Sequence, residues 1–208
     1  MKARICIVLM IFGLVAALTG CAGSKIYLME VKYLTEQKAA PGTRVVGICP
    51  FEDMREAKEK DVIGVRHRGG KYVDLMKLEG VSLSEAVTQA IQDYFIDNGF
   101  QVTDCKGWDQ TPEGLDRLPR DLTLVVGGKI DSLMVEAKSG VTITNLNYNV
   151  KVRGLIGKIK ERKVVTRTIE STPKEKKVGF DPEYVQGKLD SILTEVIQKL
   201  LEECLAYE

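Results

Sequence analysis

The sequence predicts an α+β fold in which two amphipathic helices pack on one face of a mainly antiparallel sheet of about five strands. Two segments, residues 82–98 and 181–201, repeat apolar side chains at helical spacing. Residues 145–156 alternate apolar and polar side chains, as a strand with one buried and one solvated face does. One layer of helices on one sheet buries all of these apolar faces at once.

The domain is expected to open with a buried strand followed by a long loop. Residues 44–49 form an apolar run that Pro50 stops, which predicts a short buried strand. Residues 51–80 are strongly polar and are expected to be a loop, with a short strand inside it at 73–78. A loop of that length is unusual in a compact domain and is often functional or mobile.

The first helix has sequence signals at both of its ends. Ser82 and Glu85 have the spacing of a capping box, so the helix is expected to begin there. Gly99 is a suitable residue to follow the last helical turn. Residues 100–105 then have the composition of the next strand.

Three longer strands and the second helix complete the domain. The strands are expected at residues 122–137, 145–156 and 164–171. Gly127 and Gly128 are expected to mark a bulge or a bend in the first of them. Asp181 and Pro182 are a suitable cap and first residue for a helix, and an apolar stripe continues from there to the chain end.

The amino terminus has the pattern of an export signal. Lys2 and Arg4 precede an uncharged, mostly apolar run of 14 residues at 5–18. A helix of that length reaches about 21 Å, which is short of the roughly 30 Å hydrocarbon core of a bilayer. The run therefore fits the apolar part of a signal peptide. The alternatives are a membrane anchor, or an ordinary signal peptide with a chance cysteine after it.

Leu18-Thr19-Gly20-Cys21 comes next and resembles the lipobox of bacterial lipoproteins. In that family the cysteine thiol carries acyl chains such as palmitate, and the chain is cut before the cysteine. The resemblance implies cleavage between Gly20 and Cys21 and lipid attachment at Cys21. Several acyl chains hold a protein on a membrane much more firmly than one chain does. Because Ala22 stands where aspartate retains enterobacterial lipoproteins in the inner membrane, the resemblance implies the periplasmic face of the outer membrane.

The chain is therefore expected to have three parts. Residues 1–20 are a lipoprotein signal peptide, residues 21–43 are a lipidated tether with a candidate edge strand, and residues 44–208 are a single periplasmic domain. The whole chain has 30 Lys+Arg and 29 Asp+Glu. Removal of Lys2 and Arg4 leaves 28 against 29, a net charge of −1, which provides no field to attract nucleic acid.

A second resemblance covers most of the mature chain. Pro50-Phe51-Glu52-Asp53-Met54-Arg55 follows a strand and resembles the Pro-Phe-x-Asp-x-Arg opening of YajG-type lipoproteins. Residues 86–102 resemble the helix and Gly-Phe-x-Val segment of that family. The motifs are loose and are shared with CsgG-like and LpoB-like periplasmic domains. The YajG type has no established enzymatic activity, so the resemblance implies a fold and a location, and not a mechanism.

The residues that could carry catalysis or bind a metal are few. His67 is the only histidine, and it lies in a glycine-rich charged stretch without a nucleophile motif, so a solvated histidine is expected. Cys49, Cys105 and Cys204 have no ligand-like spacing, so no metal site and no other cofactor is expected. Either three buried thiols or one disulfide among these cysteines is compatible with an oxidising periplasm.

Two surfaces are candidates for binding. Arg66, Arg68 and Lys71 are a candidate contact for an anion, a lipid headgroup or a partner, against the alternative of a plain surface loop. The polar face of residues 145–153 is a candidate partner surface, against the alternative of ordinary solvated sheet.

The predicted function is a membrane-anchored, non-enzymatic binding or assembly module of the cell envelope, with another envelope protein or peptidoglycan as its partner. The alternative is an envelope hydrolase that uses carboxylates from the loops after residues 50 and 105. Two convergent carboxylates with raised pKa values would favour the hydrolase.

Overall fold

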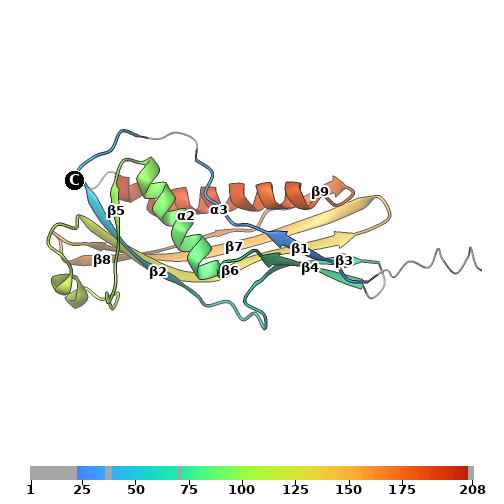
Figure 1. Cartoon of the computed structure of the whole chain (residues 1–208), viewed down its shortest axis with the longest axis horizontal. Helices are drawn as coiled ribbons and strands as arrows, with labels where there is room; N and C mark the ends of the chain where they lie inside the picture. Colours follow the sequence, from blue (N-terminus) through green and yellow to red (C-terminus); the bar gives the residue numbers. More distant parts are fainter. Residues whose placement is uncertain (1–22, 36–38, 70–71, 206–208) are drawn as a thin grey trace, which may run out of the picture.

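Nine strands and two helices make up the fold in the part of the chain that the computed structural model describes, which is residues 23–35, 39–69 and 72–205 (Figure 1). The strands are β1 (Ile26–Met29), β2 (Val45–Asp53), β3 (Val62–Arg68), β4 (Tyr72–Leu78), β5 (Gln101–Asp104), β6 (Leu124–Ser139), β7 (Ile143–Lys158), β8 (Lys163–Ser171) and β9 (Lys174–Val178). The helices are α2 (Leu83–Asp97) and α3 (Pro182–Leu205), and η1 (Glu113–Arg117) is a short 3-10 helix.

The long antiparallel hairpin of β6 and β7 organises the sheet. The two strands pair from Leu124 opposite Lys158 to Ser139 opposite Thr144. On the other edge of β6, β2 pairs parallel with its first half and β3 pairs parallel with its second half, so β2 and β3 follow one another along β6. On the outer edge of β7, β8 and β9 divide the strand in the same way. Parallel pairing adds β5 beside β2 and β1 beside β4, and β4 is antiparallel to β3.

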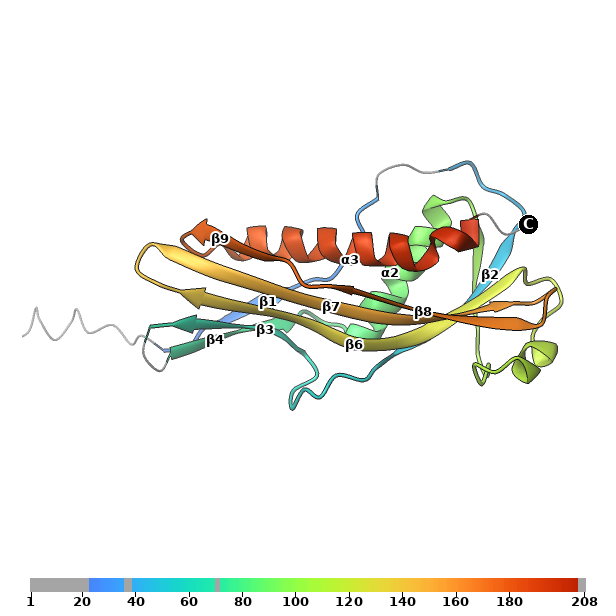
Figure 2. The ribbon, with the colours of Figure 1, turned by 180° about the vertical axis from the view of Figure 1, so that it is seen from behind.

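Both helices cover the same face of this sheet. α3 runs along the β6–β7 hairpin, and α2 crosses over β2 (Figures 1 and 2). They bury one continuous apolar core against the sheet, which includes Val87, Ile91, Phe95, Leu189, Leu193, Ile197, Leu124, Val126, Leu133 and Val135. Within the described residues, no helix is both long and apolar enough to cross a bilayer.

A smaller apolar cluster covers part of the opposite face. The connection from β5 to β6 carries η1 and folds over this face, where Trp108 and Leu115 pack against Val125. Cys49 and Cys105 lie in the same cluster. Between residues 145 and 153, β7 lines this face with polar side chains, of which Asn145 and Asn149 are exposed.

The predicted fold class was wrong about the sheet. Instead of about five mainly antiparallel strands, the sheet has nine strands and is mixed, with four parallel pairings. The two helices do occur where they were expected. Ser82 and Glu85 form the predicted capping box, and Asp181 accepts a hydrogen bond from the backbone N–H of Glu183.

The two missed strands, β3 and β9, both carry several charged side chains. The region 51–80 was expected to be a loop with one short strand at 73–78, and that strand is β4. The region also contains the end of β2 and the whole of β3, which were not expected. β9 has the sequence Lys-Glu-Lys-Lys-Val and no apolar alternation. It forms because it completes the edge of β7, where Glu175 accepts a hydrogen bond from the hydroxyl of Tyr148.

The two adjacent glycines of β6 lie at the expected irregularity, on the side of β2, where the register shifts between Ile48 opposite Val126 and Phe51 opposite Gly128. The pairing of β6 with β7 shifts register later, between Ile130 and Ser132. A Cβ atom at Gly128 would lie 2.1 Å from the carbonyl oxygen of Arg153 and 2.5 Å from a ring carbon of Phe51. Only glycine fits at that position, because both neighbours are held in the sheet and the core.

Candidate functional site at the amino-terminal end of the sheet

Two of the three basic residues predicted as a candidate anion contact lie on strand β3 and flank a buried carboxylate. Asp74 of β4 is fully buried, and its carboxylate lies 3.0 Å from Arg68 Nη2 and 3.6 Å from Arg66 Nη1. Residues 66 and 68 are two apart on one strand, so their side chains leave the same face of the sheet. Lys71 lies outside the described residues.

Arg66 is also held by neutral groups around it. Its guanidinium donates to Ser139 Oγ at 2.9 Å and to the Tyr27 hydroxyl at 3.1 Å. The same group lies 4.2 Å from the centre of the Phe180 ring, a cation–π distance. Arg66 therefore joins β1, β3, β6 and the segment before α3 at one point.

The same cluster fixes the first described residues of the chain. Arg68 Nη2 donates to the carbonyl of Gly23 at 2.6 Å, and the backbone N–H of Lys25 donates to Asp74 at 2.8 Å. β1 then pairs with β4 from Ile26 onwards. The chain is thus fastened to the domain only two residues after Cys21.

The chain after β1 continues on the surface of the domain. Three successive hydrogen bonds attach it to α3: the backbone N–H groups of Glu30, Lys32 and Leu34 donate to Gln186, Asp190 and Thr194. The expected tether at 21–43 therefore contains an edge strand, β1, and a segment that follows α3 through residue 34.

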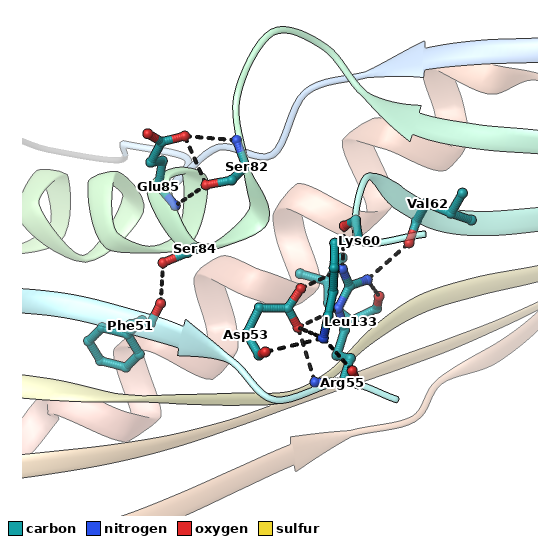
Figure 3. A network of polar contacts seen from close by, with 9 residues as sticks. All are labelled: Phe51, Asp53, Arg55, Lys60, Val62, Ser82, Ser84, Glu85 and Leu133. Carbon is teal, nitrogen blue, oxygen red and sulfur yellow. Dashed lines mark hydrogen bonds and ion pairs between the residues drawn. The ribbon is translucent and has the colours of Figure 1, made fainter. Parts of the chain in front are cut away.

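The Pro-Phe-x-Asp-x-Arg motif forms a buried polar network between the end of β2 and the start of β3 (Figure 3). All five N–H donors of the Arg55 guanidinium are used. Two of the bonds go to the Asp53 carboxylate at 2.9 Å, and three go to the backbone carbonyls of Lys60, Val62 and Leu133 at 2.7–3.0 Å. Burial opposes ionisation of Asp53, but the hydrogen bonds and charge of Arg55 outweigh it and hold the pKa of Asp53 below its ordinary value.

This network ties three strands and a helix together. It connects the end of β2, the start of β3 and the middle of β6. Next to it, Ser84 donates to the carbonyl of Phe51 (Figure 3). The backbone N–H of Phe51 donates to Thr88 at 2.9 Å, and the two bonds attach α2 to β2. The motif on which the family resemblance rests is therefore structural in this chain.

The candidate catalytic side chains do not converge. His67 lies on β3 with nearly half of its side chain exposed, 3.8 Å from Glu136. Cys49, Cys105 and Cys204 are all buried free thiols. Burial raises the pKa of Cys49, and burial raises the pKa of Cys204 to about 12, whereas a nucleophilic thiol needs a lowered pKa. No cluster of metal-ligating side chains occurs among the described residues.

Among the carboxylates outside the predicted sites, Asp190 has a raised pKa. It lies on α3 among residues that face the core, and burial raises its pKa to about 6. The carboxylate of Asp109, in the loop after residue 105, accepts hydrogen bonds from Thr111 that lower its pKa.

Asp74 and Asp190 were missed by the sequence reasoning, although a signal exists for each. Asp74 shares the inward phase of its strand with Met76 and Leu78, and Asp190 follows Leu189 in the apolar stripe of its helix. A charge at a core position of a periodic segment indicates a buried polar contact.

The helix face carries two grooves of about 460 and 450 Å³. The first lies between the ends of α2 and α3 and is lined by Tyr33, Tyr94 and Lys199, among others. The second lies between α2 and residues 30–32, with Ala86 and Ala90 on its floor and four acidic side chains around it.

No family model and no curated protein sequence matches this chain. Its fold is similar to that of a DUF330-family protein from Xanthomonas campestris, with a TM-score of 0.54 at 10% identity over 88% of this chain and 96% of that one. At that identity the likeness establishes a shared fold.

Two further solved structures are more distant. A homologue of a neuraminyllactose-binding haemagglutinin from Helicobacter pylori matches with a TM-score of 0.43 at 8% identity, over 84% of this chain and 97% of that one. A lipoprotein from Neisseria meningitidis matches with a TM-score of 0.39 at 8% identity, over 75% and 99%.

Proposed function

We propose that this chain is a lipid-anchored protein of the bacterial cell envelope whose folded domain binds or assembles with another envelope component. The observation that carries the proposal is the position of the lipobox. Cys21 comes two residues before Gly23, which Arg68 fastens to the end of the sheet. An acyl chain on Cys21 would therefore hold the domain itself on a membrane, without a long flexible linker.

The outer membrane is the proposed location, and it rests on Ala22 alone. Aspartate at that position is the inner-membrane signal of the lipoproteins that the sequence resembles. The proposed assignment to the YajG type rests on the Asp53–Arg55 motif, and the same motif occurs in related envelope domains.

The proposed role is non-enzymatic. A hydrolase would need a carboxylic acid that stays protonated near neutral pH beside a second carboxylate. Among the carboxylates that follow residues 50 and 105, Asp53 at the end of β2 and Asp109 both have lowered pKa values because of the hydrogen-bond donors around them. These two carboxylates fit the role of structural acceptors.

Substitution of the lipobox cysteine tests the anchor. Cys21→Ala is expected to abolish metabolic labelling with radioactive palmitate and to release the domain from the membrane fraction. Cys204→Ala is the matched control, because Cys204 is a buried thiol of the domain and its loss is expected to leave labelling unchanged. Persistent labelling of the Cys21→Ala chain would contradict the proposal.

Crosslinking in intact cells tests the binding role. A photoreactive residue at an exposed position of the groove beside α2, such as Gln89, is expected to capture a defined envelope protein or a peptidoglycan fragment. The same residue at Thr166, on β8 at the other edge of the sheet, is the control. Equal, unspecific capture at both positions would contradict a binding site in that groove.

A further inference from the structure

Three apolar side chains are exposed together at the turn between β6 and β7. Val141 is fully exposed, Val178 is 82% exposed and Ile143 is 47% exposed. Ile143 pairs with Val178 across the β7–β9 ladder, and the backbone N–H of Gly179 donates to the carbonyl of Thr142. We call residues 139–143 together with Val178 the apolar tip. The tip contains no charged residue.

The apolar tip lies at the end of the sheet where the described chain begins. Arg68 is opposite Ser139 on β6 and opposite Tyr72 on β4, and it donates to the carbonyl of Gly23. These pairings place Gly23, the last residue of β3 and the first residue of the tip at the same level. Figures 1 and 2 show the β6–β7 turn, the end of β3, the start of β4 and the start of β1 at one end of the molecule.

Covalent geometry limits how far Cys21, the proposed lipid site, can lie from Gly23, which is fastened at the same end of the sheet as the apolar tip. Consecutive Cα atoms are 3.8 Å apart, so Cys21 Cα lies within about 8 Å of Gly23 Cα. Gly23 and Lys25 are both hydrogen-bonded to the Arg68–Asp74 cluster, so the folded domain begins there without slack. A lipid on Cys21 therefore brings this end of the domain, and no other, to the bilayer surface.

The charges at this end suit a lipid surface. Glu136 and Asp181 are each paired with a lysine, Lys138 and Lys177 respectively. The carboxylate of Asp74 is buried between two arginines, which leaves one surplus positive charge in that cluster. Positive charge near an apolar surface group is the combination that favours binding to anionic membranes.

We infer that the apolar tip rests in the headgroup region of the bilayer that holds the acyl chains, so that the domain stands on the membrane on this end. The inference rests on the proposed lipid attachment at Cys21. It assigns the exposed apolar side chains of the tip to contact with lipid, beside Arg66 and Arg68, for which a lipid headgroup was one of the expected contacts.

A tryptophan at the tip tests the inference in the acylated full chain. Val141→Trp is reconstituted into vesicles of phosphatidylethanolamine and phosphatidylglycerol with or without brominated acyl chains, which quench tryptophan on contact. The native Trp108 is 7% exposed, lies in the cluster under η1, and contributes a constant background. The brominated lipid is expected to remove at least about half of the emission that Val141→Trp adds, as for a side chain at the headgroup boundary.

The matched control is Ile96→Trp, because Ile96 is 49% exposed and lies at the end of α2. Its added emission is expected to be unaffected by bromine. A second variant, Val141→Trp with Val178→Asp, is expected to lose most of the quenching, while circular dichroism confirms that it is folded.

Mass spectrometry of the amino-terminal peptide separates the two ways of failing. An acylated protein in which Val141→Trp and Ile96→Trp are quenched equally would overturn the contact of the tip and leave the proposed anchor standing. A protein without acyl chains on Cys21 would overturn both.

Discussion

Replacement of Arg55 by methionine is expected to destabilise the domain more than any single surface change. Arg55 is 6% exposed and donates all of its five hydrogen bonds inside the protein. Methionine fills a similar volume but donates none of them. The substitution leaves the carboxylate of Asp53, which is 13% exposed, with only the half-exposed Lys60 ammonium at 3.7 Å, and it removes a donor from three backbone carbonyls.

The expected cost follows from the pair alone. Removal of one partner from a buried ion pair costs about 3–5 kcal/mol, because the other charge stays buried without compensation. Domains of this size have unfolding free energies of about 5–15 kcal/mol, and each 1 kcal/mol shifts Tm by about 2–4 °C. Arg55→Met is therefore expected to lower Tm by roughly 6–20 °C.

Denaturant unfolding of the purified full chain, followed by circular dichroism, measures this cost. Arg117→Met is the matched control, because the Arg117 side chain is 71% exposed and pairs with Asp109 at 3.5 Å. Its cost is expected to stay within about 0.5 kcal/mol. The double variant Asp53→Asn, Arg55→Met is expected to cost less than the sum of the two single variants. An Arg55→Met cost below about 1 kcal/mol would refute the structural role of the motif.

Acidification gives an independent measurement on the same pair. The pKa of Asp53 is lowered in the folded state, so the stability from the pair is present above its unfolded value of about 4 and is lost as pH falls through the folded value. The stability difference between the wild type and Arg55→Met is therefore expected to shrink below about pH 4. A constant difference across that range would contradict ionic pairing.

Two further substitutions have effects of predictable sign. Burial raises the pKa of Asp190 to about 6, so the folded state keeps its proton to a higher pH than the unfolded chain and stability falls as pH rises from about 4 to about 6. Asp190→Asn is expected to remove that fall and to stabilise the domain by about 1–3 kcal/mol near pH 7, measured by urea unfolding at both pH values. Gly128→Ala is expected to destabilise by several kcal/mol, roughly the cost of overpacking a core, because its Cβ would lie 2.1 Å from the Arg153 carbonyl. Gly127→Ala, where the nearest atom is 3.2 Å away, is expected to cost clearly less in the same thermal melt, and equal costs would contradict the close-approach explanation.

The helices could be predicted because their signals are local. The Ser82–Glu85 capping box and the Asp181 cap depend on residues three or fewer positions apart, and the structure contains both. The apolar stripes that follow these caps have a single period, and the core that they bury lies on one side. Both signals can be recognised without knowing how the rest of the chain folds.

The sheet could not be predicted in the same way, because its missing strands are specified by distant partners. β3 carries Arg66 and Arg68, whose charges indicate an exposed surface when the sequence is taken alone. In the structure they flank the buried carboxylate of Asp74 on β4. β9 is polar except for its last residue, Val178, and it forms by pairing with the free edge of β7. The Asp53–Arg55 motif was identified from the sequence, but its structural role depends on carbonyls as far away as Leu133.

If Cys21 carries the proposed lipid, the length of the β6–β7 hairpin sets the height of the domain above the membrane. A strand rises about 3.3 Å per residue, so a strand of 16 residues such as β6 spans about 50 Å from one end of the domain to the other. If the domain stands on its apolar tip, η1 and the turn after Lys158 are presented at most that far into the periplasm. A partner that binds those segments would have to lie within about that distance of the lipid, and the hairpin would set the spacing between that partner and the bilayer.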